Sequence, residues 1–321
     1  MLSADQKSRF LSQGYLLVEA VLDPEFSLDP IVDEYTALLD ALVNDLLAKG
    51  ELSQAHAGLD FGARLTKVYA ETGRTFAQYF NLSLPITGVE RDTPFWVGPA
   101  ILRLIRTPAL LDIVESIIGP EISSNPIQHI RIKPPQALLP QEQHGSGLVG
   151  TTPWHQDAAV IPPDAGTELL TVWVPINDAP VEMGCLKLLE GAHKAGLQEH
   201  GLGRVDGLAL PDDVANERRV RVVPAKRGDV ILIHRYCPHA SLPNTSNQLR
   251  FSLDLRFHPA HQPSGRDIMP SFVARSRSDP SQELTDALAW RSKWEDTRTW
   301  LATSPDAPKV NYDWLQSSSL T

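Results

Sequence analysis

The chain has 321 residues, of which 42% are hydrophobic and 21% are charged, a composition ordinary for a globular protein with a sizeable core. Its formal net charge of −10 argues against nonspecific binding to nucleic acid, because such binding needs a basic surface. There is no secretion signal, no stretch near the ~20 apolar residues of a membrane span, and too few cysteines for a disulfide framework, which together predict a cytoplasmic protein without a membrane partner.

The first part of the chain is predicted to be mainly helical. Helices are expected over residues 3–12, 29–50 and 107–119, with a short strand over 14–18. Proline at the first helical position and glycine at the end bound the second and third helices. Glycines interrupt the pattern between 52 and 98, and no element is predicted there.

The second part changes character. Short apolar or alternating runs, separated by Pro, Gly and Asn, predict strands over residues 127–133, 169–174, 185–189, 219–223, 230–234 and 249–258. Several short strands with turn residues between them are typical of a sandwich, a jelly roll or a barrel. Two long connections, 134–150 and 191–216, are predicted to be either functional loops, such as a lid, or disordered segments.

A histidine and an aspartate separated by one residue follow the first of these loops. On an extended strand the side chains of His155 and Asp157 would point to the same side. Two histidines and one carboxylate on one face form a facial iron triad, which leaves the opposite coordination positions open. With 10 histidines and 39 acidic residues in the chain, chance alone produces such a pair, so the pair alone does not distinguish a metal site from solvent-exposed side chains.

A third ligand must come from elsewhere in the chain. The histidines that follow the pair are His193, His200, His234, His239, His258 and His261. In a jelly roll any of them can lie beside the pair, because neighbouring strands need not be consecutive in sequence. The residues alone leave this choice open.

The segment from residue 250 to residue 257 alternates polar and apolar side chains. Phe251, Leu253, Leu255 and Phe257 share one face, and Arg250, Ser252, Asp254 and Arg256 share the other. If helices cover the apolar face, the polar face lines a pocket. Arginine offers a planar pair of donors and serine adds a hydroxyl, so this face suits a carboxylate ligand, with an ordinary surface ion pair as the alternative.

At these residues the chain resembles the phytanoyl-CoA dioxygenase family of Fe(II)/2-oxoglutarate oxygenases. The family pattern is His-x-Asp, then a distal histidine in a His-x-Ser-x-x-Asn-like segment, then an arginine eleven residues after that histidine. Arg250 stands eleven residues after His239, and this spacing selects His239 over His234.

Shorter matches in the same order extend the resemblance over residues 10 to 260. They are Trp173, eighteen residues after His155; Lys133-Pro134-Pro135; the stretch from Gly184 to Lys194; and Thr66-Lys67-Val68. Glu190 stands where the family usually has proline, and we expect this departure to leave the chemistry unchanged.

The resemblance implies Fe(II) held by His155, Asp157 and His239, and 2-oxoglutarate held by Arg250. The other cosubstrate contacts that it implies are Trp173, Ser241, Ser252 and Lys67. His129 lies on the same predicted strand face as Lys133 and is also assigned to the pocket, with a structural histidine as the alternative. No catalytic residue is predicted beyond the metal ligands.

The implied function is hydroxylation of an unactivated C–H bond of a small organic metabolite or natural product, with O2 as partner and succinate and CO2 as products. An intact Asp157 argues for hydroxylation, or for desaturation or ring chemistry, and against halogenation, because related halogenases have a small residue at this position. The alternatives are an acyl-CoA 2-hydroxylase of the phytanoyl-CoA type, a metal hydrolase and a non-catalytic jelly-roll binding module. The oligomeric state is left open.

The implied fold is mainly β with flanking α: a double-stranded β-helix (a jelly roll, cupin-like) packed against N-terminal and C-terminal helices. We expect one domain over residues 1–321. It divides into a mainly helical flank over 1–120, the jelly-roll core over 121–260 and a C-terminal helical extension over 261–321.

Overall fold

The computed structural model describes residues 1–307 except 86, 147, 203–207 and 215–218. The predicted loops 134–150 and 191–216 and the extension 261–321 each include residues outside these ranges. The helices are α1 (Ala4–Gln13), α2 (Pro24–Ser27), α3 (Asp29–Ala48), α4 (Phe61–Thr72), α5 (Pro99–Ile105), α6 (Pro108–Ile118) and α7 (Ala287–Thr303). No helix in the described part of the chain combines the length and apolar character needed to cross a membrane.

Two antiparallel sheets form the core. The strands are β1 (Tyr15–Val18), β2 (Glu121–Ser124), β3 (His129–Lys133), β4 (Leu170–Pro175), β5 (Leu186–Leu189), β6 (Gly201–Leu202), β7 (Leu208–Ala209), β8 (Val220–Val223), β9 (Val230–His234), β10 (His239–Ser241), β11 (Arg250–Pro259) and β12 (Phe272–Ser276). The seven-stranded sheet runs β1-β9-β4-β11-β2-β12, with β3 also paired to β11, and the three-stranded sheet runs β10-β5-β8.

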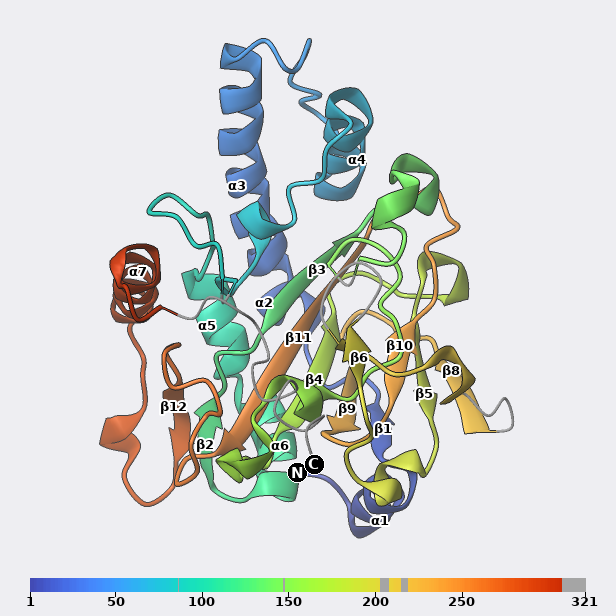
Figure 1. Ribbon diagram of the computed structural model, residues 1–321, viewed down its shortest axis with the longest axis vertical. Helices are drawn as coiled ribbons and strands as arrows, with labels where there is room; N and C mark the ends of the chain where they lie inside the picture. Colours follow the sequence, from blue (N-terminus) through green and yellow to red (C-terminus); the bar gives the residue numbers. More distant parts are fainter. Residues whose placement is uncertain (86, 147, 203–207, 215–218, 308–321) are drawn as a thin grey trace.

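The predicted fold class is confirmed. The helices α3, α5 and α6 lie on one side of the large sheet and the three-stranded sheet lies on the other, in the arrangement of a jelly roll (Figure 1). The two sheets do not close into a continuous barrel among the described residues. The outer end of α3, together with α4, projects beyond the strands (Figure 1).

The alternation of β11 divides the molecule into a hydrophobic core and a polar interior. On its apolar face, the ring centroid of Phe251 lies 5.3 Å from that of Tyr35 on α3 and 5.4 Å from that of Phe61 on α4. Burying one such aromatic side chain contributes about 1.5–3 kcal/mol. The opposite face, with Arg250 and Asp254, lines a cavity between the two sheets. The prediction that helices cover one face while the other lines a pocket is confirmed.

Parts of the fold differ from the prediction. Helix α4 was not expected, because glycines flank it and Gly62 lies within it. The helix forms because Asp60 caps its first turn by accepting a hydrogen bond from the Ala63 N–H. Strand β1 matches the strand expected over 14–18 and pairs with β9 in the large sheet, whereas β12 adds an unexpected strand beyond residue 260 by pairing with β2. The extension does carry the expected helix, α7, with Trp290 buried against the core.

Candidate metal centre

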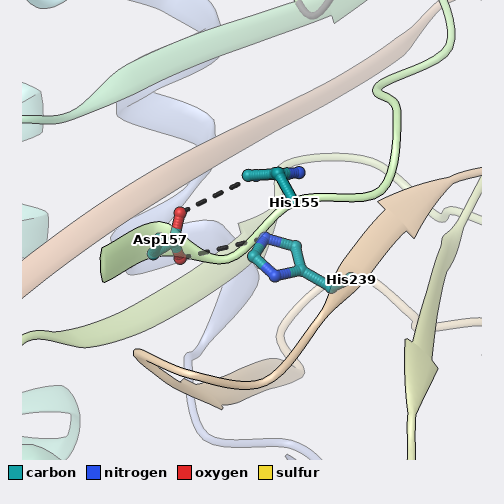
Figure 2. A group of neighbouring side chains, drawn as sticks. All are labelled: His155, Asp157 and His239. Atoms are coloured by element: carbon teal, nitrogen blue, oxygen red, sulfur yellow. Dashed lines mark ion pairs between the residues drawn. The ribbon is translucent and has the colours of Figure 1, made fainter. Parts of the chain in front are cut away.

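The structure brings His155, Asp157 and His239 together. Atoms that can bind a metal, one from each side chain, lie within 4.8 Å of one another. The Nε2 atoms of both histidines lie 3.8 Å from the carboxylate oxygens of Asp157 (Figure 2). From this spacing, small side-chain rotations reach one ion at bond lengths of about 2 Å.

Backbone pairing holds the two histidines side by side. His155 and His239 form an isolated antiparallel bridge, with N–H to carbonyl oxygen distances of 3.0 and 2.9 Å. The prediction that both residues of the His-x-Asp pair lie on an extended strand is wrong for Asp157. This residue opens a 3-10 helix over Asp157–Val160. The chain turns there, and the turn still leaves the carboxylate facing the two imidazoles.

The hydrogen bonds of the two imidazoles leave their Nε2 atoms available to a metal. The Nδ1 atom of His155 lies 2.9 Å from the Pro153 carbonyl oxygen, and that of His239 lies 3.0 Å from the Cys237 carbonyl oxygen. A carbonyl oxygen only accepts, so each Nδ1 carries the hydrogen and each Nε2 keeps its lone pair. Burial and the neighbouring His239 lower the pKa of His155 to about 3, which keeps this imidazole neutral as a ligand must be.

Two side chains fix the carboxylate of Asp157. Arg256 donates to one carboxylate oxygen and the Thr171 hydroxyl donates to the other at 2.5 Å. Burial alone would raise the pKa of Asp157, but the positive charge of Arg256, the two neighbouring imidazoles and the Thr171 hydrogen bond together outweigh it, so that pKa lies well below its usual value. The carboxylate is therefore ionised, and each of its oxygens keeps a lone pair for a metal. This donor set fits a divalent ion such as Fe(II).

Arg250 lies in the same cavity and has unused donors. Its side chain is fully buried, and one terminal nitrogen donates to the Gly184 carbonyl oxygen. Its Nε has no hydrogen-bond partner among the described residues, and neither do the indole nitrogen of Trp173 and the hydroxyl of Ser252. Burial lowers the pKa of Arg250 only to about 10, so the guanidinium stays charged. Buried donors without partners are costly, and here they fit an anionic ligand with oxygen acceptors.

Ser241 is a further donor because its oxygen is already engaged as an acceptor. The side-chain nitrogen of Lys133, whose pKa burial lowers well below its usual value, donates to the Ser241 oxygen at 2.6 Å, and the Thr152 N–H donates to it at 2.9 Å. A hydroxyl has two acceptor lone pairs and one hydrogen, so the hydrogen of Ser241 is left to donate elsewhere. Lys133 stands directly opposite Arg250 on the neighbouring strand, which places two basic side chains at this end of the cavity.

Gly184 is a backbone position on which Arg250 depends. Its φ is +79°, and an added Cβ would lie 2.5 Å from the Leu242 carbonyl oxygen. We expect Gly184→Ala to lower the free energy of unfolding by about 2 kcal/mol or more, since left-handed strain and a backbone clash act together. Chemical denaturation measures the loss. Gly166→Ala is the matched control, with φ +69° and no atom near the added Cβ. Equal losses in both variants would contradict the clash.

Four predicted cosubstrate residues are not among those that line this cavity: Ser241 and Ser252, which belong to the strands around it, and Lys67 and His129. Lys67 is exposed on α4 and lines a separate cavity of about 590 Å3, which shares no lining residue with the one at the triad. His129 lies opposite Asp254 on the neighbouring strand, with its Nδ1 3.4 Å from the Asn81 side-chain nitrogen. The structure gives Lys67 no contact with the site, and a role for Lys67 or His129 stays a prediction.

The sequence analysis missed several residues that support the site: Thr171, Arg256, Lys133 and the ion pair between Arg131 and Asp254. A signal was present for Arg256, which shares the polar face of β11, and for Thr171, which stands two residues before Trp173. The sequence could not show that Thr171 and Arg256 contact Asp157, because these contacts depend on how the segment that carries the aspartate packs against the sheet.

Comparisons with known proteins agree with this geometry. The profile of the family described as Phytanoyl-CoA dioxygenase (PhyH) matches residues 10–252. The 1-deoxypentalenic acid 11-beta-hydroxylase of Streptomyces arenae is 30% identical over 191 residues, which are 56% of this chain and 64% of that protein. The peroxisomal phytanoyl-CoA dioxygenase of Bos taurus is 28% identical over 179 residues, which are 54% of this chain and 50% of that protein. The chain therefore spans between half and two thirds of the length of these relatives.

Among solved structures, the non-heme monooxygenase ThoJ in its apo form superposes with a TM-score of 0.57 at 18% identity, covering 91% of this chain and 96% of that chain. EvdO2 from Micromonospora carbonacea var. aurantiaca superposes with a TM-score of 0.51 at 19% identity, covering 81% and 92%. At these identities the likeness concerns the fold.

Proposed function

The chain belongs to the phytanoyl-CoA dioxygenase family, and from this membership and the geometry of the site we propose that it is an Fe(II)- and 2-oxoglutarate-dependent dioxygenase. It hydroxylates an unactivated C–H bond of a small organic metabolite, with O2 as partner and with succinate and CO2 as products. One observation carries the proposal: Arg250 and Trp173, which have buried donors without partners among the described residues, line one chamber with His155 and His239 of the facial triad.

Each side of the chamber has a separate task. His155, Asp157 and His239 would hold Fe(II) on one face and leave the opposite positions open. When bound, the iron and 2-oxoglutarate supply the oxidising chemistry that acts on the C–H bond. Arg256 and Thr171 keep the carboxylate ionised and oriented, as outer partners of metal ligands commonly do.

Arg250 would bind the distal carboxylate of 2-oxoglutarate. The guanidinium offers its charge and an Nε–H, while Ser241 and Ser252 offer hydroxyl donors on the same side. Lys133 sets the direction of the Ser241 hydrogen by occupying a lone pair of its oxygen. The enclosing strands exclude water, which strengthens these charge-assisted hydrogen bonds. A hydrolase using the same triad would have no need of this anchor.

The substrate class is less constrained than the reaction. A 1-deoxypentalenic acid hydroxylase and a phytanoyl-CoA dioxygenase are both relatives of this chain, and we favour a small organic metabolite over an acyl-CoA thioester. The net charge of −10 supports this choice, since the phosphates of coenzyme A favour a basic surface. The two cysteines are buried and unpaired, which supports a reducing compartment such as the cytoplasm.

An anaerobic titration tests the proposal. Addition of Fe(II) and 2-oxoglutarate to the protein is expected to produce the weak visible charge-transfer band of the chelate. The band should be missing with Zn(II) in place of Fe(II), and in His155→Ala. After admission of O2, succinate release is measured across a metabolite library. Wild-type protein that shows neither the band nor succinate with any compound would rule out the oxygenase. Ester hydrolysis by the Zn(II) form would then favour the hydrolase.

A further inference from the structure

A second cavity lies beside the triad. It has a volume of about 180 Å3, and Ala158, Leu169 and Arg235 are among its lining residues. Ala158 directly follows the metal ligand Asp157, and its N–H donates to the Arg235 carbonyl oxygen at 3.0 Å. The cavity therefore begins next to the metal ligand.

Strand register places this cavity on the far side of the triad from Arg250. Thr171 and Ile233 are cross-strand partners on β4 and β9, and both line the chamber of the triad. Thr171 also pairs with Arg256, six residues beyond Arg250 on β11. Two positions further in this direction, just beyond the ends of the two strands, stand Leu169 and Arg235, and both line the second cavity. The second cavity therefore lies next to the chamber of the triad, on the side of the metal position away from Arg250.

Arg235 is a cation without a carboxylate partner among the described residues. Its guanidinium carbon lies 4.6 Å from the centroid of the Tyr236 ring, and its Nη1 donates to the Thr167 carbonyl oxygen. The arginines of the interior that line or support the site differ, since Arg131 pairs with Asp254 and Arg256 pairs with Asp157. Arg250 resembles Arg235, because it too has no carboxylate partner among the described residues. Arg250 is the proposed anchor for the cosubstrate.

We propose that this second cavity binds a carboxylate group of the organic substrate, with Arg235 as the anchor and the carbon skeleton reaching back toward the triad. The inference rests on the proposed oxygenase function and names the substrate class as organic acids. With Nη1 engaged by Thr167, Arg235 retains the Nε and Nη2 donors, whose planar fork matches the two oxygens of a carboxylate.

The lining of the cavity favours a carboxylate over a phosphate. Arg235 is the one charged side chain among the residues described as lining it, and the others include Ile161, Pro162, Leu169 and Leu197. A single guanidinium balances a monoanion, whereas a dianionic phosphate monoester would leave excess buried charge. The apolar side chains suit the hydrocarbon next to the acid group.

Calorimetric titrations of anaerobic protein loaded with Fe(II) and saturating 2-oxoglutarate test the inference. The probes are decanoate, cyclohexanecarboxylate and benzoate, each compared with its own primary amide, and decyl phosphate. At least one acid is expected to bind about 10-fold or more tightly than its amide, as a charge-assisted hydrogen bond predicts. The preference should vanish in Arg235→Gln and persist in part in Arg235→Lys. Arg103→Gln, at an exposed position on α5, is the control that should retain it in full.

Several results would overturn the inference. The first is that no acid binds more tightly than its amide. The second is that Arg235→Gln keeps the full preference for the acid over the amide. The third is that decyl phosphate binds more tightly than decanoate. The charge-transfer band recorded in the same samples reports on the proposed function separately. If the band is present and the preference is absent, only the assignment of Arg235 fails. If the band is absent, the function and the inference fail together.

Discussion

Replacing His239 with alanine is expected to weaken Fe(II) binding by more than about 100-fold and to abolish 2-oxoglutarate turnover. The loss of affinity should exceed the loss that follows removal of a residue that only hydrogen-bonds to a metal ligand. The remaining pair, His155 and Asp157, offers two ligands where the facial site needs three. Iron content after anaerobic reconstitution, together with an Fe(II) titration, measures the loss.

The matched control is His261→Ala, because His261 is exposed on the surface. This variant should retain the iron and the turnover of the wild type. Stability needs a separate measurement, since the change at residue 239 also removes the hydrogen bond from its Nδ1 to the Cys237 carbonyl oxygen. A folded His239→Ala protein that still binds one equivalent of Fe(II) with wild-type affinity would show that this residue is not a ligand.

Replacing Arg250 with alanine is expected to raise the 2-oxoglutarate concentration needed for half-maximal turnover by about 100-fold or more. Truncating one partner of a buried charge pair costs about 2–5 kcal/mol, and the other donors of the chamber, on Ser241, Ser252 and Trp173, carry no full charge. Iron content should stay near that of the wild type, because the contacts of the Arg250 guanidinium with the described residues are to the Gly184 carbonyl oxygen and the Trp173 ring, neither of which belongs to the triad. The informative comparison is between the rise in the 2-oxoglutarate requirement and the change in iron content.

Arg250→Lys separates the charge of the anchor from its shape. A lysine retains the positive charge but loses the planar pair of donors, so its 2-oxoglutarate requirement should fall between those of the wild type and Arg250→Ala. Arg219→Ala, at an exposed position, should behave as the wild type. Equal losses of iron and 2-oxoglutarate binding in Arg250→Ala would argue that the arginine supports the fold of the chamber and does not bind the cosubstrate.

Local patterns in the sequence were sufficient for features that depend on one segment. Alternation predicted the two faces of β11 because a strand that separates a core from a cavity needs opposite polarity on successive residues. The helix expected over 3–12 is present as α1, and the capping box of Ser3 and Gln6 at its start forms within the same segment. Spacing alone could not choose a third histidine, and the family resemblance supplied His239.

Features that depend on contacts between distant segments were not predictable. Asp157 leaves the extended conformation, and the carboxylate keeps its orientation through Arg256 and Thr171, which belong to strands far from it in sequence. Lys67 belongs to a short segment whose match is weak by itself, and α4 carries it to the exposed side of a separate cavity. A helix with an internal glycine, stabilised by packing of Phe61 on the core, gives little local signal.

The bridge between His155 and His239 bears on how the protein would acquire its ion. Main-chain hydrogen bonds place two ligands from distant segments next to each other, and Arg256 pairs with the carboxylate of the third. Folding itself thus brings the ligands together, so less of the binding free energy of the metal is spent on ordering them. An ion that binds this folded site and not the unfolded chain adds stability that rises with the logarithm of its free concentration once that concentration exceeds the dissociation constant.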